Sequence, residues 1–252
     1  FKYWDPAFTI RELEILATQY HVTSIKIADE MFVLNPEHFL RLCDLIIERR
    51  FHFNFWAYAR IDTVKESYLE KLKKAGFNWL CLGIEYGSKY VRDGVSKGKF
   101  EEDNIFEVVR KIRDAGIYVM GNFIFGLPDD TWETMQQTLD MSIELNCEMA
   151  NFYCAMAYPG SKLYPLALEK GWPLPSPWHN FSQHAYETLP LPSEYLTAGE
   201  ILSFRDKSWN IYFKNSRYLD MVEKKFGAQV RSHIQRMTSV ELPRKHAAVI
   251  SK

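Results

Sequence analysis

The alternation of short apolar runs with amphipathic helical segments constrains this chain more than any other feature. Up to about Gly171, strands are expected at 24–28, 53–59, 79–84, 117–125 and 151–155. Two helices are expected to begin at the caps Asp5-Pro6 and Asn35-Pro36, and three more to cover 64–75, 101–115 and 132–146. Consecutive strand–helix units of this kind predict an α/β fold with a parallel sheet and right-handed crossovers. The hydrophobic period is compatible with an open doubly wound sheet and with a curved partial barrel.

Composition narrows the function classes. The chain has 252 residues, of which 47% are hydrophobic, enough for one domain of barrel size with an appendage. A formal net charge of −1 gives no support for a nucleic-acid partner, and apolar runs of strand length predict no membrane span. Four cysteines in a chain of this length argue against a disulfide scaffold and favour a reducing, cytoplasmic compartment. Because the first residue is Phe1, we interpret the chain as a piece of a longer polypeptide.

The pattern changes after Gly171. Residues 172–193 are rich in proline and aromatic residues and read as a connector. Helical patterning resumes near Glu194 and continues to about Met237, which predicts a C-terminal helical region over 194–252 that packs on the core. The expected domains are therefore 1–171, 172–193 and 194–252.

The segment from Gly121 to Thr134 is the most informative stretch for function. An apolar run ends in a Gly-Leu-Pro turn, and a helix with a capping-box spacing at Asp130 and Glu133 follows at once. Because Gly126 has no Cβ, a ligand's flat face could approach the backbone there. The alternative is an ordinary strand-to-helix turn.

Polar residues stand at the ends of the other strands. In parallel α/β folds ligands bind at the carboxyl ends of strands, so we expect these residues to form one site for a zwitterionic ligand with an attached nucleoside. A carboxylate pair can hold an ammonium, a guanidinium can clamp a carboxylate, a further carboxylate can accept from ribose hydroxyls, and the glycine turn can receive a purine. The candidate residues are Asp29, Glu30, Arg60, Glu85, Ser88, Ile124, Gly126 and Tyr158.

Each candidate also has an alternative without function. Asp29 or Glu30 could cap the segment after the strand, Arg60 could pair with Asp62 on the surface, and Ser88 could be an N-cap. Glu85 could be solvated, and Tyr158-Pro159-Gly160 could be only a turn.

The order of these motifs resembles the radical S-adenosylmethionine (SAM) enzymes, and among them the large group with an upstream cobalamin-binding domain. The resemblance runs from Phe1 to Gly171 and rests on 27–30, 60–62, 83–88, 121–134 and 158–161. It implies a partial (β/α) barrel of the TIM type, here lacking its first strand. It also implies a 4Fe-4S cluster on a CxxxCxxC loop, reductive cleavage of SAM to a 5′-deoxyadenosyl radical, and hydrogen abstraction from a small-molecule substrate.

The resemblance also implies roles for the candidate residues. Asp29 and Glu30 match the acidic strand end that contacts the methionine ammonium, and Arg60 matches a position facing the carboxylate. Glu85 and Ser88 match positions near the ribose and the carboxylate. The adenine-contacting turn corresponds to Ile124 and Gly126, and the last ligand-facing strand end to Tyr158.

The sequence departs from the family in one respect, because it has no CxxxCxxC. Its cysteines, which we expect to be small buried hydrophobes, are Cys43, Cys81, Cys147 and Cys154, and no pair has cluster-type spacing. We expect the cluster loop, the first strand and any cobalamin domain in an upstream part of the same polypeptide. The alternative is a relative that has lost the cluster.

The sequence therefore predicts the SAM-binding portion of a radical SAM enzyme, inactive by itself, from a cobalamin-dependent methyltransferase or an oxidative or rearranging enzyme. Two other hypotheses are a non-catalytic SAM- or nucleotide-binding module and a barrel enzyme that uses Glu85 and Arg60 in acid–base chemistry.

The remaining candidate residues have mostly structural interpretations. His179 and His184 are a metal candidate, whereas Lys224-Lys225 and Arg244-Lys245 are interpreted as solvated helix faces or a frayed chain end. The aromatic residues between Phe51 and Tyr58 are expected to be mostly core, with a minority available to stack on a flat substrate.

Overall fold

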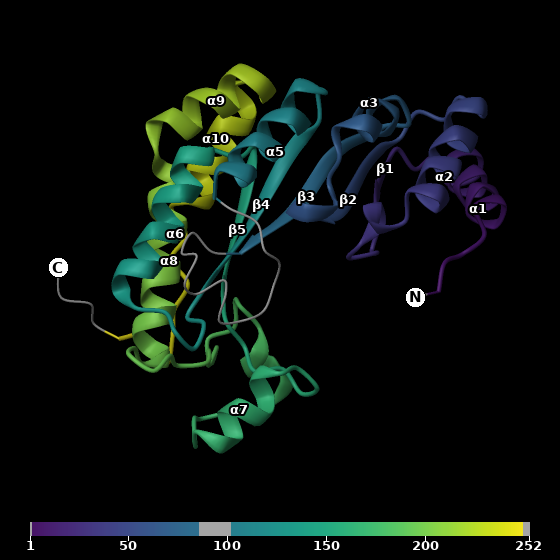
Figure 1. Ribbon diagram of the computed structural model, residues 1–252. Helices are drawn as coiled ribbons and strands as arrows, with labels where there is room; N and C mark the ends of the chain where they lie inside the picture. Colours follow the sequence, from purple (N-terminus) through teal and green to yellow (C-terminus); the bar gives the residue numbers. More distant parts are fainter. Residues whose placement is uncertain (1, 86–101, 249–252) are drawn as a thin grey trace. The chain divides into compact units, whose positions relative to one another are not determined.

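The computed structural model describes residues 2–85 and 102–248 (Figure 1). This part of the chain contains one five-stranded sheet whose strands follow each other in sequence order. Parallel pairing with the register Lys26↔Trp56 and Trp56↔Trp79 joins the first three strands. The α/β class and the partial (β/α) barrel are thereby confirmed. The strands are β1 (Ser24–Lys26), β2 (Asn54–Arg60), β3 (Phe77–Glu85), β4 (Tyr118–Phe125) and β5 (Met149–Cys154).

Helices separate the strands and make up the C-terminal region. They are α1 (Pro6–Thr18), α2 (Pro36–Glu48), α3 (Glu66–Lys74), α5 (Glu102–Asp114), α6 (Trp132–Leu145), α7 (Leu163–Glu169), α8 (Ala198–Lys214), α9 (Ser216–Phe226) and α10 (Ala228–Met237). Short 3-10 turns within the described residues lie at η1 (Phe32–Leu34), η2 (Ile61–Thr63) and η3 (Trp178–Phe181). None of the helices in the described ranges is long and apolar enough to cross a bilayer.

Local sequence signals explain several helix boundaries. Asp5 accepts from the Ala7 backbone N–H at 2.8 Å and begins α1, and Asn35 accepts from the His38 N–H at 3.4 Å and begins α2, as predicted. The turn after α3 needs glycine: Gly76 has φ of +94°, and a Cβ there would lie 2.5 Å from the Phe53 carbonyl oxygen.

The chain divides into two compact units. The first unit includes the chain up to Ile84 and continues through α5 and the start of β4, as far as Gly121. In it α1, α2, α3 and α5 contact each other in that order. Under these helices, alternate residues of β2 are buried, and Phe55 of β2 stacks on Phe77 of β3 with ring centroids 4.8 Å apart.

The second unit includes Glu85 and the chain from Asn122 onward. Here α8 packs against β5 and α6, and α9 and α10 pack on α8 (Figure 1). Tyr212 of α8 donates to the Cys147 carbonyl at 2.7 Å, which fastens the helices to the start of β5. The expected packing of the C-terminal helices on the core is therefore observed within this unit.

Two basic pairs differ from the sequence interpretation. Lys225 forms an ion pair with Glu148, whose side chain is 0% exposed. The Arg244 side chain is only 3% exposed and pairs with Asp206. Each of these cations is held by a carboxylate distant in sequence, so the interpretation as solvated faces or a frayed end was wrong for Lys225 and Arg244.

Candidate functional site

Asp29 and Glu30 follow β1 and are exposed. The Asp29 carboxylate accepts from the Met31 backbone N–H at 2.8 Å, which is the capping role considered as the alternative. Asp29 also lines a cavity of about 450 Å³ with mostly apolar walls, formed by the N-terminal residues, α1, η1 and α2. Both acidic residues therefore follow β1, and Asp29 lies beside a cavity.

Arg60 ends β2 and has a partner of its own. Its Nε and Nη2 donate to the two carboxylate oxygens of Asp62 at 3.0 and 2.6 Å, and both side chains are partly exposed. This forked geometry is the one that a guanidinium uses for any carboxylate. A ligand carboxylate would have to displace Asp62, and an exposed ion pair of this kind is weak enough to be exchanged.

Glu85 is the last residue of β3 and has an unusual backbone. It is half-buried and has φ of +70°, a left-handed conformation that side-chain-bearing residues seldom adopt. Strained residues of this kind gather at functional sites. Ser88 lies outside the described residues.

The Gly-Leu-Pro turn after β4 is held by a buried carboxylate. Asp130 is 1% exposed and accepts from the backbone N–H groups of Gly126 and Leu127, both at 2.9 Å, and from the Thr134 hydroxyl at 2.7 Å. Burial raises the pKa of this carboxyl above its ordinary value. The capping box belongs to Thr131 and Thr134, so the predicted pairing of Asp130 with Glu133 was wrong.

Gly126 is required for a reason that the sequence did not reveal. Its φ is +81°, and a Cβ there would lie 2.5 Å from the Ile201 side chain of α8. The space left by the absent Cβ is therefore filled by the protein, and the predicted approach of a ligand from that side was wrong. A ligand at this turn would meet its other side.

The remaining candidates of the second unit are anchored in local packing. Ile124 is half-buried and packs on a cluster formed by Leu127, Ala155, Ala157, Ala167 and Leu191. Tyr158 is exposed, stacks on Phe181 at 5.5 Å, and donates to the Phe181 carbonyl at 3.3 Å. The structure thus groups Asp29, Glu30 and Arg60 in one unit, and Glu85, Ile124, Gly126 and Tyr158 in the other.

The four cysteines do not form a cluster site. All are buried, as predicted. Burial raises the pKa of Cys43 and Cys154 to about 12 and that of Cys81 to about 11, which opposes the thiolate form that iron requires. Residues 2–85 and 102–248 hold no group of three or more His, Cys, Asp and Glu suited to a metal.

Sequence reasoning missed a buried polar cluster under the connector. Arg205 donates to the Phe152 carbonyl at 2.7 Å and to Asp206 at 2.5 Å. Arg244 donates to Asp206, to the carbonyls of Gln183 and Ala185, and to the Thr188 hydroxyl. The sequence carries no local signal for this cluster, because Arg244 lies 38 residues from Asp206.

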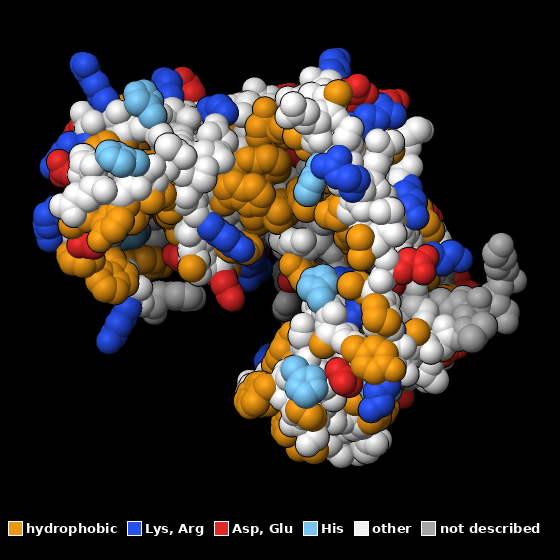
Figure 2. Space-filling model, turned by 180° about the vertical axis from the view of Figure 1, so that it is seen from behind, with side chains coloured by type: hydrophobic (Ala, Val, Ile, Leu, Met, Phe, Trp, Pro, Cys, Tyr) orange, Lys and Arg blue, Asp and Glu red, His pale blue; other side chains and the backbone are white. Residues whose placement is uncertain are grey.

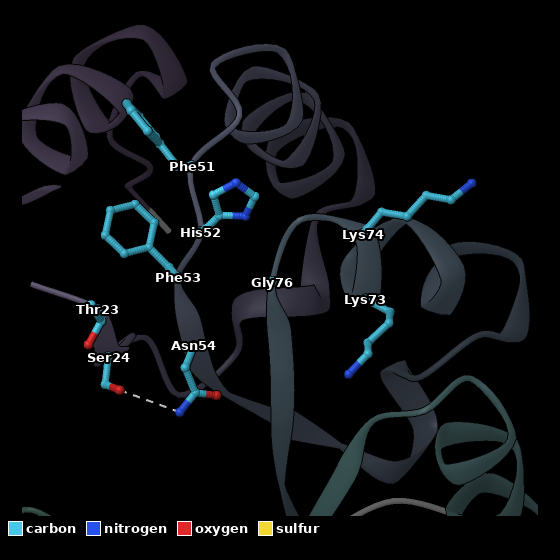
Figure 3. A pocket seen from close by; sticks show the side chains of 9 residues that line it. All are labelled: Thr23, Ser24, Phe51, His52, Phe53, Asn54, Lys73, Lys74 and Gly76. Atoms are coloured by element: carbon cyan, nitrogen blue, oxygen red, sulfur yellow. Dashed lines mark hydrogen bonds between the residues drawn. The ribbon is translucent and has the colours of Figure 1, made fainter.

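A further cavity lies at the opposite, amino ends of β1 and β2 (Figure 3). Its volume is about 430 Å³, and its basic side chains, Lys73 and Lys74, are paired with Asn78 at 2.6 Å and with Glu70 at 2.7 Å. Both lysines lie in the last turn of α3, where cations stabilise a helix end. The two lysines of this cavity therefore have partners within the protein and a role at the end of α3.

Comparison with known proteins identifies the family. The profile of the radical SAM superfamily matches residues 5–142, more than half of the chain. The chain belongs to the radical SAM superfamily. The match covers β1 to β4 and the polar strand ends after them, so the resemblance seen in the sequence is confirmed.

Two curated relatives are similar over most of this chain. An uncharacterized methyltransferase of Pyrococcus horikoshii is 27% identical over 173 residues, which are 69% of this chain and 38% of the relative. The anaerobic magnesium-protoporphyrin IX monomethyl ester cyclase of Rubrivivax gelatinosus is 26% identical over 227 residues, 87% of this chain and 40% of the relative. The chain thus spans about two fifths of the length of these relatives.

Solved structures share the fold. The radical SAM methyltransferase TsrM from Kitasatospora setae, described with cobalamin and a 4Fe-4S cluster bound, superposes with a TM-score of 0.54 at 23% identity, covering 59% of this chain and 30% of TsrM. The cobalamin-dependent radical SAM enzyme OxsB gives a TM-score of 0.57 at 15% identity, covering 93% of this chain and 41% of OxsB.

Proposed function

We propose that this chain is the SAM-binding portion of a radical SAM enzyme. One observation carries the proposal: the superfamily match over 5–142 spans strands whose carboxyl ends bear the acidic pair Asp29-Glu30 and the cation Arg60. These charges are opposite to the ammonium and the carboxylate of the methionine moiety.

The proposed site assigns one part of SAM to each group of residues. Asp29 and Glu30 hold the ammonium, and Arg60 exchanges Asp62 for the methionine carboxylate. Glu85 and Ser88 form hydrogen bonds with the ribose hydroxyls and the methionine carboxylate. Ile124, Gly126 and Tyr158 contact the adenosine, on the side of the turn away from Ile201.

The iron–sulfur cluster of the family does not fit this chain's own cysteines, because all four are buried with raised pKa values or are held in the core. We therefore place the cluster ligands in another part of the polypeptide and expect this chain alone to be inactive in radical chemistry. A cobalamin domain in that other part would make the whole protein a methyltransferase or an oxidative or rearranging enzyme, as the names of the relatives suggest.

The burial of the cysteines also supports a second candidate function. A module that binds SAM or a nucleotide without cleaving it would need the strand-end residues and no cluster. The two candidates differ in one measurable product, since only the first yields 5′-deoxyadenosine.

The experiment uses the natural polypeptide that contains this chain. After anaerobic reconstitution with iron and sulfide, we expect reductive cleavage of SAM to 5′-deoxyadenosine and methionine. A formed cluster without this product refutes the radical function and favours the binding module. The chain of 252 residues alone, treated in the same way, is expected to show no stoichiometric cluster absorbance.

Point variants test the binding residues separately. Arg60→Gln and Glu85→Ala are expected to weaken SAM binding by about tenfold, since each removes a charge-assisted hydrogen bond. Asp62→Asn frees the guanidinium and is expected to tighten binding. Glu14→Gln is the matched control, because Glu14 forms a similar exposed pair with Arg49 at 2.7 Å. Equal affinity in all four variants removes Arg60 and Glu85 from the site.

A further inference from the structure

Half-buried aromatic side chains cover one face of the sheet in the first unit. The members are Trp56 and Tyr58 of β2, Trp79 of β3 and Tyr118 of β4, and we call this set the aromatic face. Alternation places the fully buried Phe55, Ala57 and Ala59 on the opposite side, under the helices. The sheet therefore has one aromatic layer sealed in the core and another that is half-exposed.

The rings of the aromatic face form a continuous surface across three strands. Trp56 and Trp79 are register partners and stack with centroids 4.5 Å apart and an interplanar angle of 18°. Tyr118 follows at 5.0 Å from Trp79. Indole and phenol rings arranged side by side offer a broad, rigid π surface.

A cation stands at the edge of this surface. Lys26 of β1 is exposed, is the register partner of Trp56, and places its Nζ 5.1 Å from the centre of the Tyr58 ring. Arg60 lies two residues beyond Tyr58 on the same side of β2, at its carboxyl end. The aromatic face thus carries positive charge at its edge, and it leads toward a proposed SAM-binding residue.

We infer that the aromatic face binds the substrate of this enzyme, and that the substrate is a flat conjugated molecule with an anionic group. The inference rests on the proposed function, because the face lies beside Arg60. Flat π systems gain most from stacking on indole rings, and an anionic substituent complements Lys26.

The sealed aromatic layer shows why core packing does not explain the aromatic face. Phe32 and Phe55 both stack on Phe77, with centroids 4.9 and 4.8 Å apart, and all three are 5% exposed or less. That layer already supplies the hydrophobic contact between the sheet and its helices. Two tryptophans held half-exposed on the other side match the lining of a ligand site, which combines aromatic walls with few charged groups. The back view in Figure 2 shows hydrophobic side chains gathered over the strands with basic side chains beside them.

The test measures binding of model compounds to the 252-residue chain by titration calorimetry. Anthracene carboxylate carries both features of the inferred substrate, perhydroanthracene carboxylate lacks the flat π system, and anthracene carboxamide lacks the charge. We expect anthracene carboxylate to bind about tenfold more tightly than the saturated analogue and about fivefold more tightly than the amide. Equal binding of the flat and saturated compounds overturns the inference.

Variants locate the binding. Trp79→Leu keeps an apolar side chain but removes the flat ring, and is expected to weaken anthracene carboxylate binding by about tenfold. Lys26→Gln is expected to abolish the preference for the carboxylate over the amide. Trp178→Leu is the matched control, because Trp178 is 75% exposed and belongs to the other unit. Unchanged binding in a folded Trp79→Leu chain, as judged by circular dichroism, refutes the inference.

A second readout separates this inference from the proposed function. In the reconstituted natural polypeptide, Trp79→Leu is expected to leave SAM affinity unchanged. If the wild-type polypeptide fails to bind or cleave SAM while the model compound still depends on Trp79, the proposed function falls and the aromatic face stands as a ligand site. If SAM is cleaved but the affinity for the model compound is the same in wild type and Trp79→Leu, the substrate inference alone is wrong.

Discussion

The side chain of Ile201 occupies the position that a Cβ on Gly126 would take, with a closest distance of 2.5 Å. Ile201 belongs to α8, whereas Gly126 lies at the end of β4 in the turn proposed to contact adenosine. Ser193 adds a second contact, since its hydroxyl donates to the Asp130 carbonyl at 2.7 Å. The connector and the C-terminal region therefore fix the shape of the turn, although both lie beyond the segment that the superfamily profile matches.

Gly126→Ala is expected to destabilise the protein through both the left-handed backbone and the clash with Ile201. Together these effects should lower the free energy of unfolding by about 3 kcal/mol, measured by urea denaturation. Gly171→Ala is the matched control, because Gly171 also has positive φ, +65°, but nothing lies within 4 Å of its added Cβ. Its cost should be about 1 kcal/mol. Equal costs for the two variants would show that Ile201 moves aside freely.

Asp130 is expected to make stability depend on pH in the direction opposite to a salt-bridged carboxylate. Burial raises its pKa above the ordinary value of 3.8, so between these two values the native state binds more protons than the unfolded state. Its contribution to stability is then greatest at low pH and is lost as pH rises through the folded pKa. Asp130→Asn cannot titrate, so the stability of wild type relative to this variant should fall with rising pH above 3.8.

The measurement is urea denaturation of both proteins across the acidic range. Asp130→Asn also loses an acceptor for buried N–H groups, which adds a nearly constant cost of about 1–2 kcal/mol. If the stability of wild type relative to Asp130→Asn instead rises with pH, the hydrogen bonds from Gly126 and Leu127 to the ionised carboxylate outweigh the effect of its burial.

Arg244→Gln is expected to release the C-terminal segment from the connector. The guanidinium is buried and contacts Asp206, the carbonyls of Gln183 and Ala185, and the Thr188 hydroxyl. Its loss leaves the Gln183 and Ala185 carbonyls without this donor and leaves Asp206 paired with Arg205 alone. The variant should cost about 3 kcal/mol and show faster proteolysis within 183–188. Lys245→Gln is the control and should change neither quantity. Proteolysis at the wild-type rate would contradict the role of Arg244 as a tether.

Lys225→Met tests the buried carboxylate of Glu148. Methionine preserves the apolar part of the side chain but removes the cation, so the variant should lose about 2–4 kcal/mol of unfolding free energy. The neighbouring Lys224→Met should stay within about 0.5 kcal/mol of wild type, as is usual for surface substitutions. A similar result for both lysines, measured by thermal denaturation, would show that Glu148 does not need this ion pair.

Much of the fold and some of the site could be predicted from local patterns. The caps at Asp5 and Asn35 were correct because the side chain and the N–H that it accepts from are two or three residues apart. The capping box was misplaced because Asp130 and Thr131 are both good caps. Only the path of the turn decides that Asp130 accepts from Gly126 and Leu127 while Thr131 begins α6.

The sequence by itself determined the strand–helix order, the family, the burial of the cysteines and the kinds of charge at the strand ends, since each is written in neighbouring residues and their spacing. The tertiary structure decided that Ile201 fills the space beside Gly126 and that Arg244 is buried against Asp206, 38 residues away. It also decided which aromatic rings are sealed in the core and which form the aromatic face. These features depend on contacts between distant segments, and such contacts leave no periodic signal in a single sequence.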